Sequence, residues 1–203
     1  MKIAKKHMNR MAQYSRNSNT HNKKGVHGKW LENFLSDHYD FPQYDQYKAK
    51  VDFPKEIVEQ GNVPAEWVAD WEVKYYNIKT PVVMLGDLER KMECLKNGLV
   101  IVIGFYDGTP DNLVDIKFIK AKANNNLIKY FDAWKKVSQF VKNRENSIEE
   151  TKQFVKQANA ENKSKFLIAN NSQPISWKTA TGKSFGEARA VSLAITTKNL
   201  MEL

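Results

Sequence analysis

The sequence predicts an α/β fold of the α+β kind, with a central mixed β-sheet flanked by helices and a basic N-terminal arm. Three observations lead to this prediction. Residues 99–105 form an unbroken apolar run, which is typical of a strand buried on both faces. Segments on both sides of that run carry apolar residues at helical spacing. With 203 residues, 41% of them hydrophobic, the chain is long enough to bury a full core.

The first part of the chain predicts helices, then a turn and a strand. Leu31, Phe34 and Leu35 are spaced as on one face of a helix, and Pro54 favours the start of another. The aromatic and β-branched residues that follow favour a strand. The predicted elements are a helix over 28–38, a short helix over 55–59, a turn at 61–62 and a strand over 67–78.

The second part predicts strands and helices in alternation. Asp87 suits a helix N-cap, Asn97-Gly98 suits a helix end, and residues 107–110 carry a turn signal between two strands. The predicted elements are a strand or connector over 81–85, a helix over 87–96, paired strands over 99–106 and 113–121, helices over 124–142 and 148–160, and a strand over 165–169.

The net charge of +9 is concentrated near the N-terminus. Residues 1–30 hold eight lysines and arginines and no acid, so the rest of the chain carries only +1. We expect residues 1–27 to form a flexible basic arm and residues 28–203 to form one domain. Such an arm suits a polyanion, and double-stranded DNA is the expected partner. The cations expected to contact DNA are Lys5, Lys6, Arg10, Arg16, Lys23, Lys24, Lys29 and, beside Trp177, Lys178.

The composition argues against several other classes of protein. Cys94 is the only cysteine, which excludes an internal disulfide and suits the reducing cytoplasm, where we expect this chain. The three histidines near the N-terminus, His7, His21 and His27, lack the neighbouring Cys or acid of a zinc site. The apolar runs are too short for a membrane span or a signal-peptide core, so we expect no membrane. Gly182-Lys183-Ser184 lacks the earlier glycine of a phosphate-binding loop, so we expect no nucleotide cofactor.

The segment Asp70-Trp71-Glu72-Val73-Lys74 is the first candidate for a catalytic site. Residues two apart on a strand point to the same face, so Glu72 and Lys74 would lie together, with Glu66 and Asp70 on that face as well. Carboxylates hold Mg²⁺, and a lysine close to the metal can act on the attacking water in phosphodiester hydrolysis. The same acid-x-Lys pattern occurs at Asp115 and Lys117, which together with Asp107 form a rival site.

The order of these segments resembles the PD-(D/E)xK nuclease superfamily, and within it the small homodimeric type II restriction endonucleases. The resemblance covers about residues 28–137, and its parts are a helix carrying Glu32, the strand with Glu72-Val73-Lys74, a helix, an apolar strand ending in Phe105-Tyr106-Asp107-Gly108, a second strand and an aromatic helix. It implies a restriction-endonuclease-like fold in which Glu72 binds the metal and Lys74 is the catalytic lysine. For the superfamily's first acid, the candidates in order of preference are Glu66, Asp70 and Asp52.

The resemblance implies a function as well as a fold. We expect a Mg²⁺-dependent endonuclease, with Mn²⁺ as a substitute, in which Glu66, Asp70 and Glu72 provide the metal ligands. It would cut double-stranded DNA at a short palindromic site as a homodimer and leave 5′-phosphate ends. A junction-resolving or repair nuclease of the same fold is one alternative. A non-catalytic nucleic-acid-binding protein, of phage or regulatory type, is another.

Overall fold

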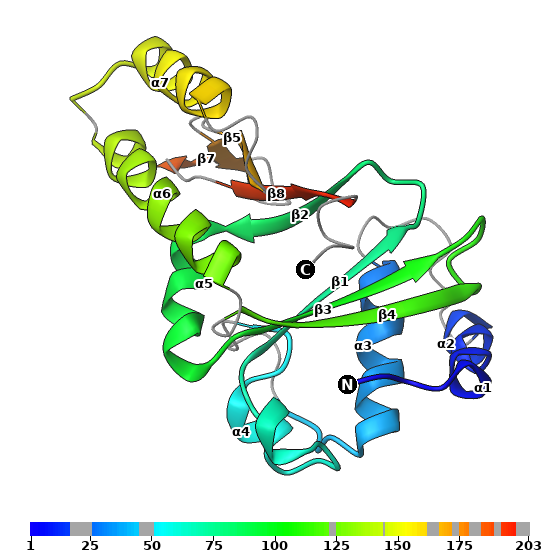
Figure 1. Ribbon diagram of the computed structural model, residues 1–203. Coiled ribbons are helices and arrows are strands. Elements are labelled where there is room, and N and C mark those ends of the chain that lie inside the picture. Colours follow the sequence, from blue (N-terminus) through cyan, green and yellow to red (C-terminus); the bar gives the residue numbers. More distant parts are fainter. Residues whose placement is uncertain are drawn as a thin grey trace. The chain divides into compact units, whose positions relative to one another are not determined.

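The computed structural model describes residues 1–16, 26–44, 51–121, 125–143, 145–161, 167–171, 175–178, 184–188 and 192–197. The chain forms two compact units (Figure 1). The first consists of Met1–Thr80 and Glu93–Asn124, and the second of Pro81–Met92 and Asn125–Leu203. We expected one domain over residues 28–203. The division arises because strand β2 (Val82–Asp87) pairs with strand β8 (Ser192–Thr196), which comes far later in the chain.

The first unit is built on a three-stranded mixed sheet in the order β1-β3-β4. Its strands are β1 (Trp71–Asn77), β3 (Val100–Tyr106) and β4 (Leu113–Lys120). The central strand β3 pairs in parallel with β1 and antiparallel with β4. The apolar run predicted as a central strand is therefore confirmed, and so is the hairpin that follows it. The mixed sheet flanked by helices agrees with the expected α+β class.

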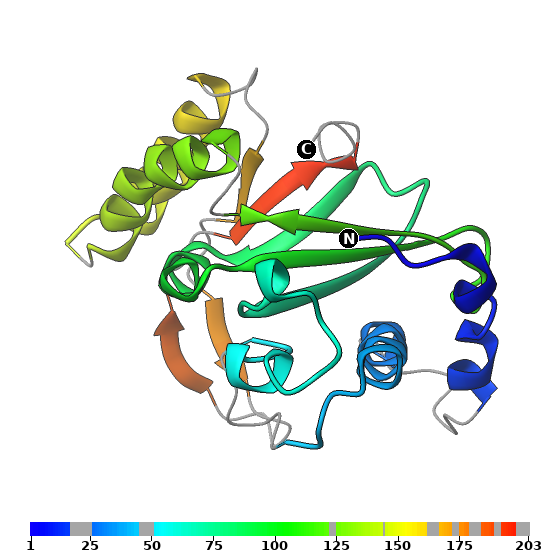
Figure 2. The same ribbon diagram turned by 60° about the horizontal axis from the view of Figure 1, so that its bottom comes forward.

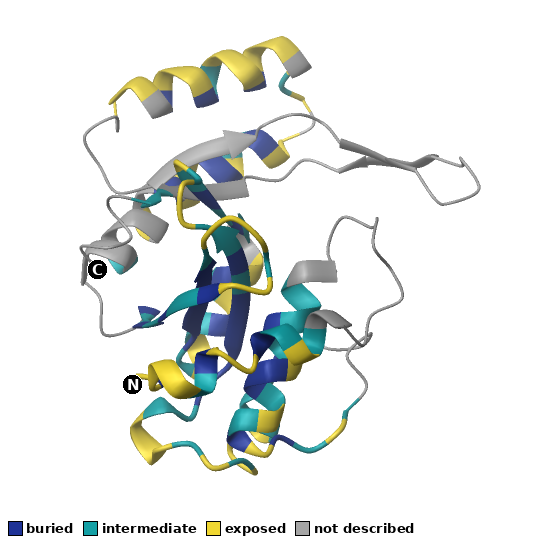
Figure 3. Ribbon diagram, turned by 90° about the vertical axis from the view of Figure 1, so that its right-hand side faces the viewer, coloured by how far each residue is buried: buried dark blue, intermediate teal, exposed yellow. Residues whose placement is uncertain are grey.

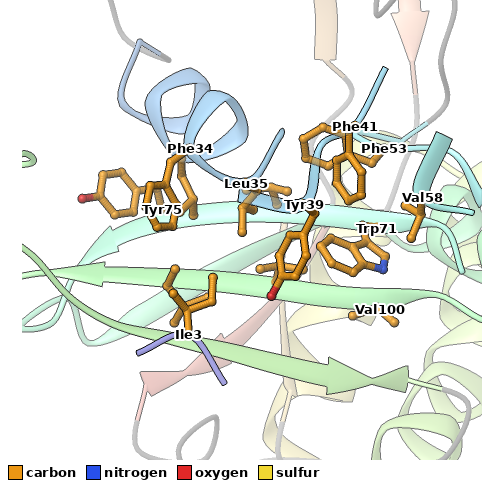
Figure 4. Close-up of a cluster of buried hydrophobic side chains, with 14 of the residues drawn as sticks. Ile3, Phe34, Leu35, Tyr39, Phe41, Phe53, Val58, Trp71, Tyr75 and Val100 are labelled. Atoms are coloured by element: carbon orange, nitrogen blue, oxygen red, sulfur yellow. The ribbon is translucent and has the colours of Figure 1, made fainter. Parts of the chain in front are cut away.

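One face of this sheet packs against helix α3 (Val26–Tyr39). Trp71, Val73 and Tyr75 alternate along β1 and join the core cluster with Phe34 and Leu35 of α3 (Figure 4). Figure 2 looks along α3 and shows the helix lying on one side of the strands. The buried residues concentrate in the strands and in the side of α3 that faces them (Figure 3). Because a strand alternates, Glu72 and Lys74 lie on the opposite face.

The N-terminal residues pack on this core, contrary to the flexible arm that we expected over residues 1–27. Residues 1–16 form two short helices, α1 (Lys5–Met8) next to β4 and α2 (Met11–Arg16) next to α3. Ile3, Met8 and Met11 are at most 6% exposed and belong to the same core cluster. Residues 17–25 of the expected arm lie outside the described residues.

The segment before β1 is less regular than we expected. The strand predicted over 67–78 begins at Trp71, because Pro64 is followed by a 3₁₀ turn, η1 (Ala65–Trp67). The short helix α4 (Lys55–Val58) follows Pro54, as predicted. The helix predicted over 87–96 is α5 (Leu88–Cys94) followed by a 3₁₀ turn, η2 (Leu95–Asn97). Gly98, at φ 81°, closes it in the left-handed conformation that glycine adopts without strain.

The second unit contains helices and two further sheets. The helices α6 (Asn125–Lys142) and α7 (Ile148–Glu161) agree with the predicted ranges, and Phe140 stacks on Phe154 between them. Strand β5 (Leu167–Asn171) pairs with β8, so that one sheet has the order β2-β8-β5. Strands β6 (Ile175–Lys178) and β7 (Ser184–Ala188) form the second sheet. Among the helices of the described ranges, none is long and apolar enough to cross a membrane.

Candidate active site

Strand β1 places an acid and a lysine side by side on the face opposite the core. Lys74 Nζ donates a hydrogen bond to Glu72 Oε1 at 2.5 Å. The Glu72 side chain is 7% exposed and that of Lys74 is 21% exposed, so solvent reaches the lysine more readily than the acid. The predicted pairing of these two residues on one face is thus what the structure shows.

A third charged residue reaches this pair from the open edge of the sheet. Phe53 and Trp71 form an isolated antiparallel bridge, with N···O distances of 3.0 and 2.8 Å. This bridge holds Asp52 beside β1, where Asp52 Oδ2 accepts a hydrogen bond from the Val73 N–H at 2.7 Å. The residue that joins Glu72 and Lys74 is therefore Asp52, the candidate for the first acid that lies farthest away in sequence.

The three groups perturb one another electrostatically. Burial raises the pKa of Asp52 to about 6, and the negative charge of Glu72 adds to this effect, while Lys74 and the Val73 N–H oppose it. For Lys74, burial lowers the pKa, but the carboxylates of Glu72 and Asp52 outweigh burial and leave the pKa above its ordinary value. Lys74 is accordingly a firmly charged ammonium. Two neighbouring acids, Glu72 and Glu32, disfavour the negatively charged form of Asp52.

The second of these acids is Glu32 on helix α3. Its negative charge also raises the pKa of Asp52, although it contributes less than Glu72. Glu32 Oε2 accepts a hydrogen bond from Lys29 Nζ at 3.1 Å, one helical turn earlier. Glu72 and Glu32 thus both act on Asp52, and the carboxylates of Glu72 and Asp52 act on the ammonium of Lys74. An excess of negative charge at one point favours a bound cation.

The chemistry of these side chains fits Mg²⁺. Oxygen-only donors suit Mg²⁺ or Mn²⁺, and Mg²⁺ commonly binds through one or two carboxylates while it keeps water or phosphate as its other ligands. Asp52 and Glu72 provide two such carboxylates beside Val73. Within the described residues, no group of three or more His, Cys, Asp or Glu side chains is already arranged as a metal cluster. The remaining ligands would then be water and a substrate phosphate.

The two acids that we preferred for the metal lie elsewhere. Glu66 is exposed on η1, and its charge acts on the N-terminal amine of Met1. Asp70 is buried and supports the fold, because its Oδ1 accepts from the Lys55 N–H at 2.8 Å and its Oδ2 accepts from Asn97 Nδ2 at 3.1 Å. Since β1 begins at Trp71, the alternation that would place Glu66 beside Glu72 does not extend that far.

The residues of the rival site lie apart: Asp115 and Lys117 are on β4, and Asp107 is in the turn between β3 and β4. Lys117 on β4 pairs with Ile103, which in turn pairs with Lys74, so Lys117 lies on the same sheet face two strands away. Asp115 Oδ1 accepts the N–H of Ile116 at 2.9 Å. Partial burial lowers the pKa of Lys117, against the charge of Asp115. Asp107 lies in the exposed turn and pairs with Lys79 at 3.2 Å.

The cations expected to bind DNA fall into three groups. Lys5, Lys6 and Arg10 are exposed in the N-terminal helical segment, and Lys29 pairs with Glu32. Arg16 ends α2 and Lys178 ends β6, but their side chains lie outside the described residues, as do Lys23 and Lys24 entirely.

Comparison of the chain with protein-family models, with curated protein sequences and with solved structures gave no match.

Proposed function

We propose that this protein is a Mg²⁺-dependent DNA endonuclease, with Asp52, Glu72 and Lys74 as its catalytic group. The observation that carries the proposal is that the Asp52 carboxylate reaches the backbone between Glu72 and Lys74, so that two acids and a lysine meet on one strand. The resemblance to PD-(D/E)xK nucleases supports it, since an acid preceding an acid-x-Lys strand is the pattern of that superfamily. A restriction-endonuclease-like fold for the β1-β3-β4 sheet and its helices belongs to the same proposal.

In this proposal the side chains divide the work. Asp52 and Glu72 hold the metal, and Glu32 adds negative charge that acts on Asp52. The metal, when bound, supplies the positive charge that activates water and stabilises the phosphate in the transition state. Because its neighbours raise its pKa, Lys74 stays protonated. It donates a hydrogen bond and neutralises developing charge rather than taking a proton from water.

The overall reaction is hydrolysis of one phosphodiester bond. Water attacks phosphorus, the bond from phosphorus to the 3′-oxygen breaks, and the leaving oxygen takes up a proton. The products are a 5′-phosphate and a 3′-hydroxyl, as the resemblance implies. Cleavage of both strands at a palindromic site would require two copies of the chain related by a twofold axis.

Incubation with plasmid DNA tests this function. The wild-type protein should give discrete fragments with Mg²⁺ or Mn²⁺ and none with excess EDTA. The Lys74→Ala and Asp52→Ala variants should still bind DNA but should no longer cleave it. Lys117→Ala is the matched control, because Lys117 lies on the same sheet face but away from the three groups, and it should cut like the wild type.

Other results would redirect the proposal. Cleavage by Lys74→Ala at the wild-type rate, together with loss in Lys117→Ala, would move the site to β4. A smear of products would indicate a nuclease without sequence preference. Gel retardation with no cleavage under any metal would favour a non-catalytic nucleic-acid-binding protein. Cutting of branched but not linear duplexes would indicate a junction-resolving enzyme.

A further inference from the structure

The N-terminal segment combines buried anchors with exposed cations. Ile3, Met8 and Met11 are 6%, 6% and 0% exposed and pack in the main core cluster. Between and around them lie four exposed cations, Lys2, Lys5, Lys6 and Arg10. The apolar residues therefore fix the backbone, and the backbone in turn fixes where the four positive charges project.

This segment is also joined to the helix that carries Glu32. Tyr14 OH donates to Asp37 Oδ2 of α3 at 2.8 Å, and the ring of His7 lies edge-on to His38 with centroids 5.2 Å apart. Asp37 follows Glu32 by five residues, which is about 7.5 Å along a helix axis. The cations and the candidate active site thus belong to one compact unit and share α3 as a support.

The charged side chains of the N-terminal segment are all positive. Residues 1–30 contain no acid, so no acid near in sequence offsets the four cations. The acids that come near it belong to neighbouring elements: Asp37 bonds Tyr14, Asp40 acts on His38, Glu66 acts on the N-terminal amine of Met1, and Asp111 of the β3–β4 turn lines a pocket with Met8. A fixed cluster of exposed lysine and arginine is complementary to the regular negative charge of a nucleic-acid backbone.

We propose that residues 1–16 form a preordered platform that binds the phosphate backbone of the DNA duplex, in the same compact unit as the candidate active site. The inference rests on the proposed function for the identity of the partner. It differs from the flexible arm of the sequence analysis in one respect, which is that folding positions the cations before DNA arrives. A preordered surface loses less conformational entropy on binding than a flexible segment does. Phosphate contacts from such a platform position the duplex on the protein without reading its sequence.

Binding of a labelled duplex in EDTA, followed by fluorescence anisotropy over a range of salt concentrations, tests the platform without requiring cleavage. A quadruple variant with Lys2, Lys5, Lys6 and Arg10 changed to Ala should lower the slope of log affinity against log salt by about three to four, at roughly 0.9 per lost phosphate contact. Met11→Ala keeps every charge and removes the most deeply buried anchor. It should lose a substantial part of the same slope, as should Tyr14→Phe, which removes the bond to Asp37 and keeps the apolar ring.

A matched charge control separates position from net charge. Changing the exposed Lys79, Lys96, Lys135 and Lys136 to Ala removes as much charge from other parts of the described surface, and it should alter the slope much less. Circular dichroism melts show which anchor variants remain folded, and Tyr14→Phe decides the question if Met11→Ala does not.

Three results would overturn the inference. The first is wild-type binding by the folded anchor variants, which would mean that the cations act without fixed positions. The second is an equal effect of the control quadruple variant. The third is binding to anionic phosphatidylserine vesicles in preference to duplex DNA, which would assign the surface to a membrane. A wild-type protein that binds DNA as predicted but never cuts it would count against the proposed function alone.

Discussion

The Asp52 carboxylate accepts a hydrogen bond from the backbone N–H of Val73 at 2.7 Å. Val73 stands between Glu72 and Lys74, so this one bond links a distant acid to the middle of the acid-x-Lys strand. Val73 itself points its side chain into the core. Val73 therefore packs β1 against the core through its side chain, and its backbone amide holds Asp52 beside β1.

Asp52→Asn should separate charge from structure. Asparagine keeps an oxygen that can accept the Val73 N–H but removes the negative charge, so the fold should persist while metal binding weakens. We expect the cleavage rate to fall by about two orders of magnitude or more, in line with the loss of a group that acts directly in catalysis. Single-turnover rates and chemical denaturation measure the two effects. Glu66→Gln, at an exposed acid on η1, is the control and should cut like the wild type.

Asp70→Ala should do the opposite of Asp52→Asn, lowering stability while leaving cleavage unchanged. Its two oxygens accept from the Lys55 N–H and the Asn97 amide in partly buried hydrogen bonds, and the substitution leaves both donors without these acceptors. We expect the free energy of unfolding to fall by about 1–3 kcal/mol. At a temperature where the variant is still folded, the cleavage rate should match that of the wild type. A stable, folded Asp70→Ala protein without activity would return Asp70 to the active site.

The raised pKa of Asp52 gives a signed pH dependence. Its ordinary value is 3.8 and its value in the folded chain is about 6, chiefly through burial and then the charge of Glu72. Between these pH values the folded state binds more protons than the unfolded state, so this group makes the protein less stable as pH rises from about 4 to about 6. Denaturation across this range should show that trend in EDTA, and Asp52→Asn should remove it. Cleavage should increase over the same range, because metal binding needs the ionised acid.

His38 should act with the opposite sign. Burial lowers its pKa, His7 and Arg10 lower it further, and Asp40 opposes them. Below about 6.5 the unfolded chain takes up a proton that the folded chain resists, so stability from this group is lost as pH falls. Because His38 contacts His7 of α1, the N-terminal helices should loosen first. Limited proteolysis near Arg10 at pH 7 and at pH 5 measures this, and His38→Gln should reduce the difference.

Two glycines should respond in opposite directions to the same substitution. A Cβ on Gly104 of β3 would lie 2.6 Å from Leu31 Cδ2 and 2.8 Å from Tyr75 Cδ2, so Gly104→Ala should cost about 1–3 kcal/mol through overpacking between the sheet and α3. Gly28, inside α3, has nothing within 4 Å of that position, so Gly28→Ala should stabilise the helix by up to about 1 kcal/mol. Urea denaturation of both variants gives the comparison.

Periodic patterns made part of this structure predictable from the sequence. The apolar run gave β3, the turn at 107–110 gave the β3–β4 hairpin, and a period of two placed Glu72 and Lys74 on one face. Each of these signals lies within a short stretch of chain. The N-terminal helices were missed for a local reason as well, since eight cations in thirty residues hid the apolar spacing of Ile3, Met8 and Met11.

Long-range pairing accounts for the rest. A single bridge between Phe53 and Trp71 places Asp52, and one isolated bridge leaves no repeating pattern in the sequence. The pairing of β2 with β8 joins segments about a hundred residues apart and divides the chain into two units. Glu32 was visible as part of a helix, but its effect on Asp52 depends on how α3 packs against the sheet.

The arrangement of β1 has a consequence for deuterium exchange. One side of β1 is covered along its length by β3, while the other side carries the Phe53 bridge and the Asp52 carboxylate. Amides of β3, which is paired on both sides, should therefore exchange last and report global unfolding. The Val73 amide faces the open edge and is protected by a side chain, so it should exchange through a smaller opening. The hydrogen bond from Val73 to Asp52 would then open and close while the β1-β3-β4 sheet stays intact.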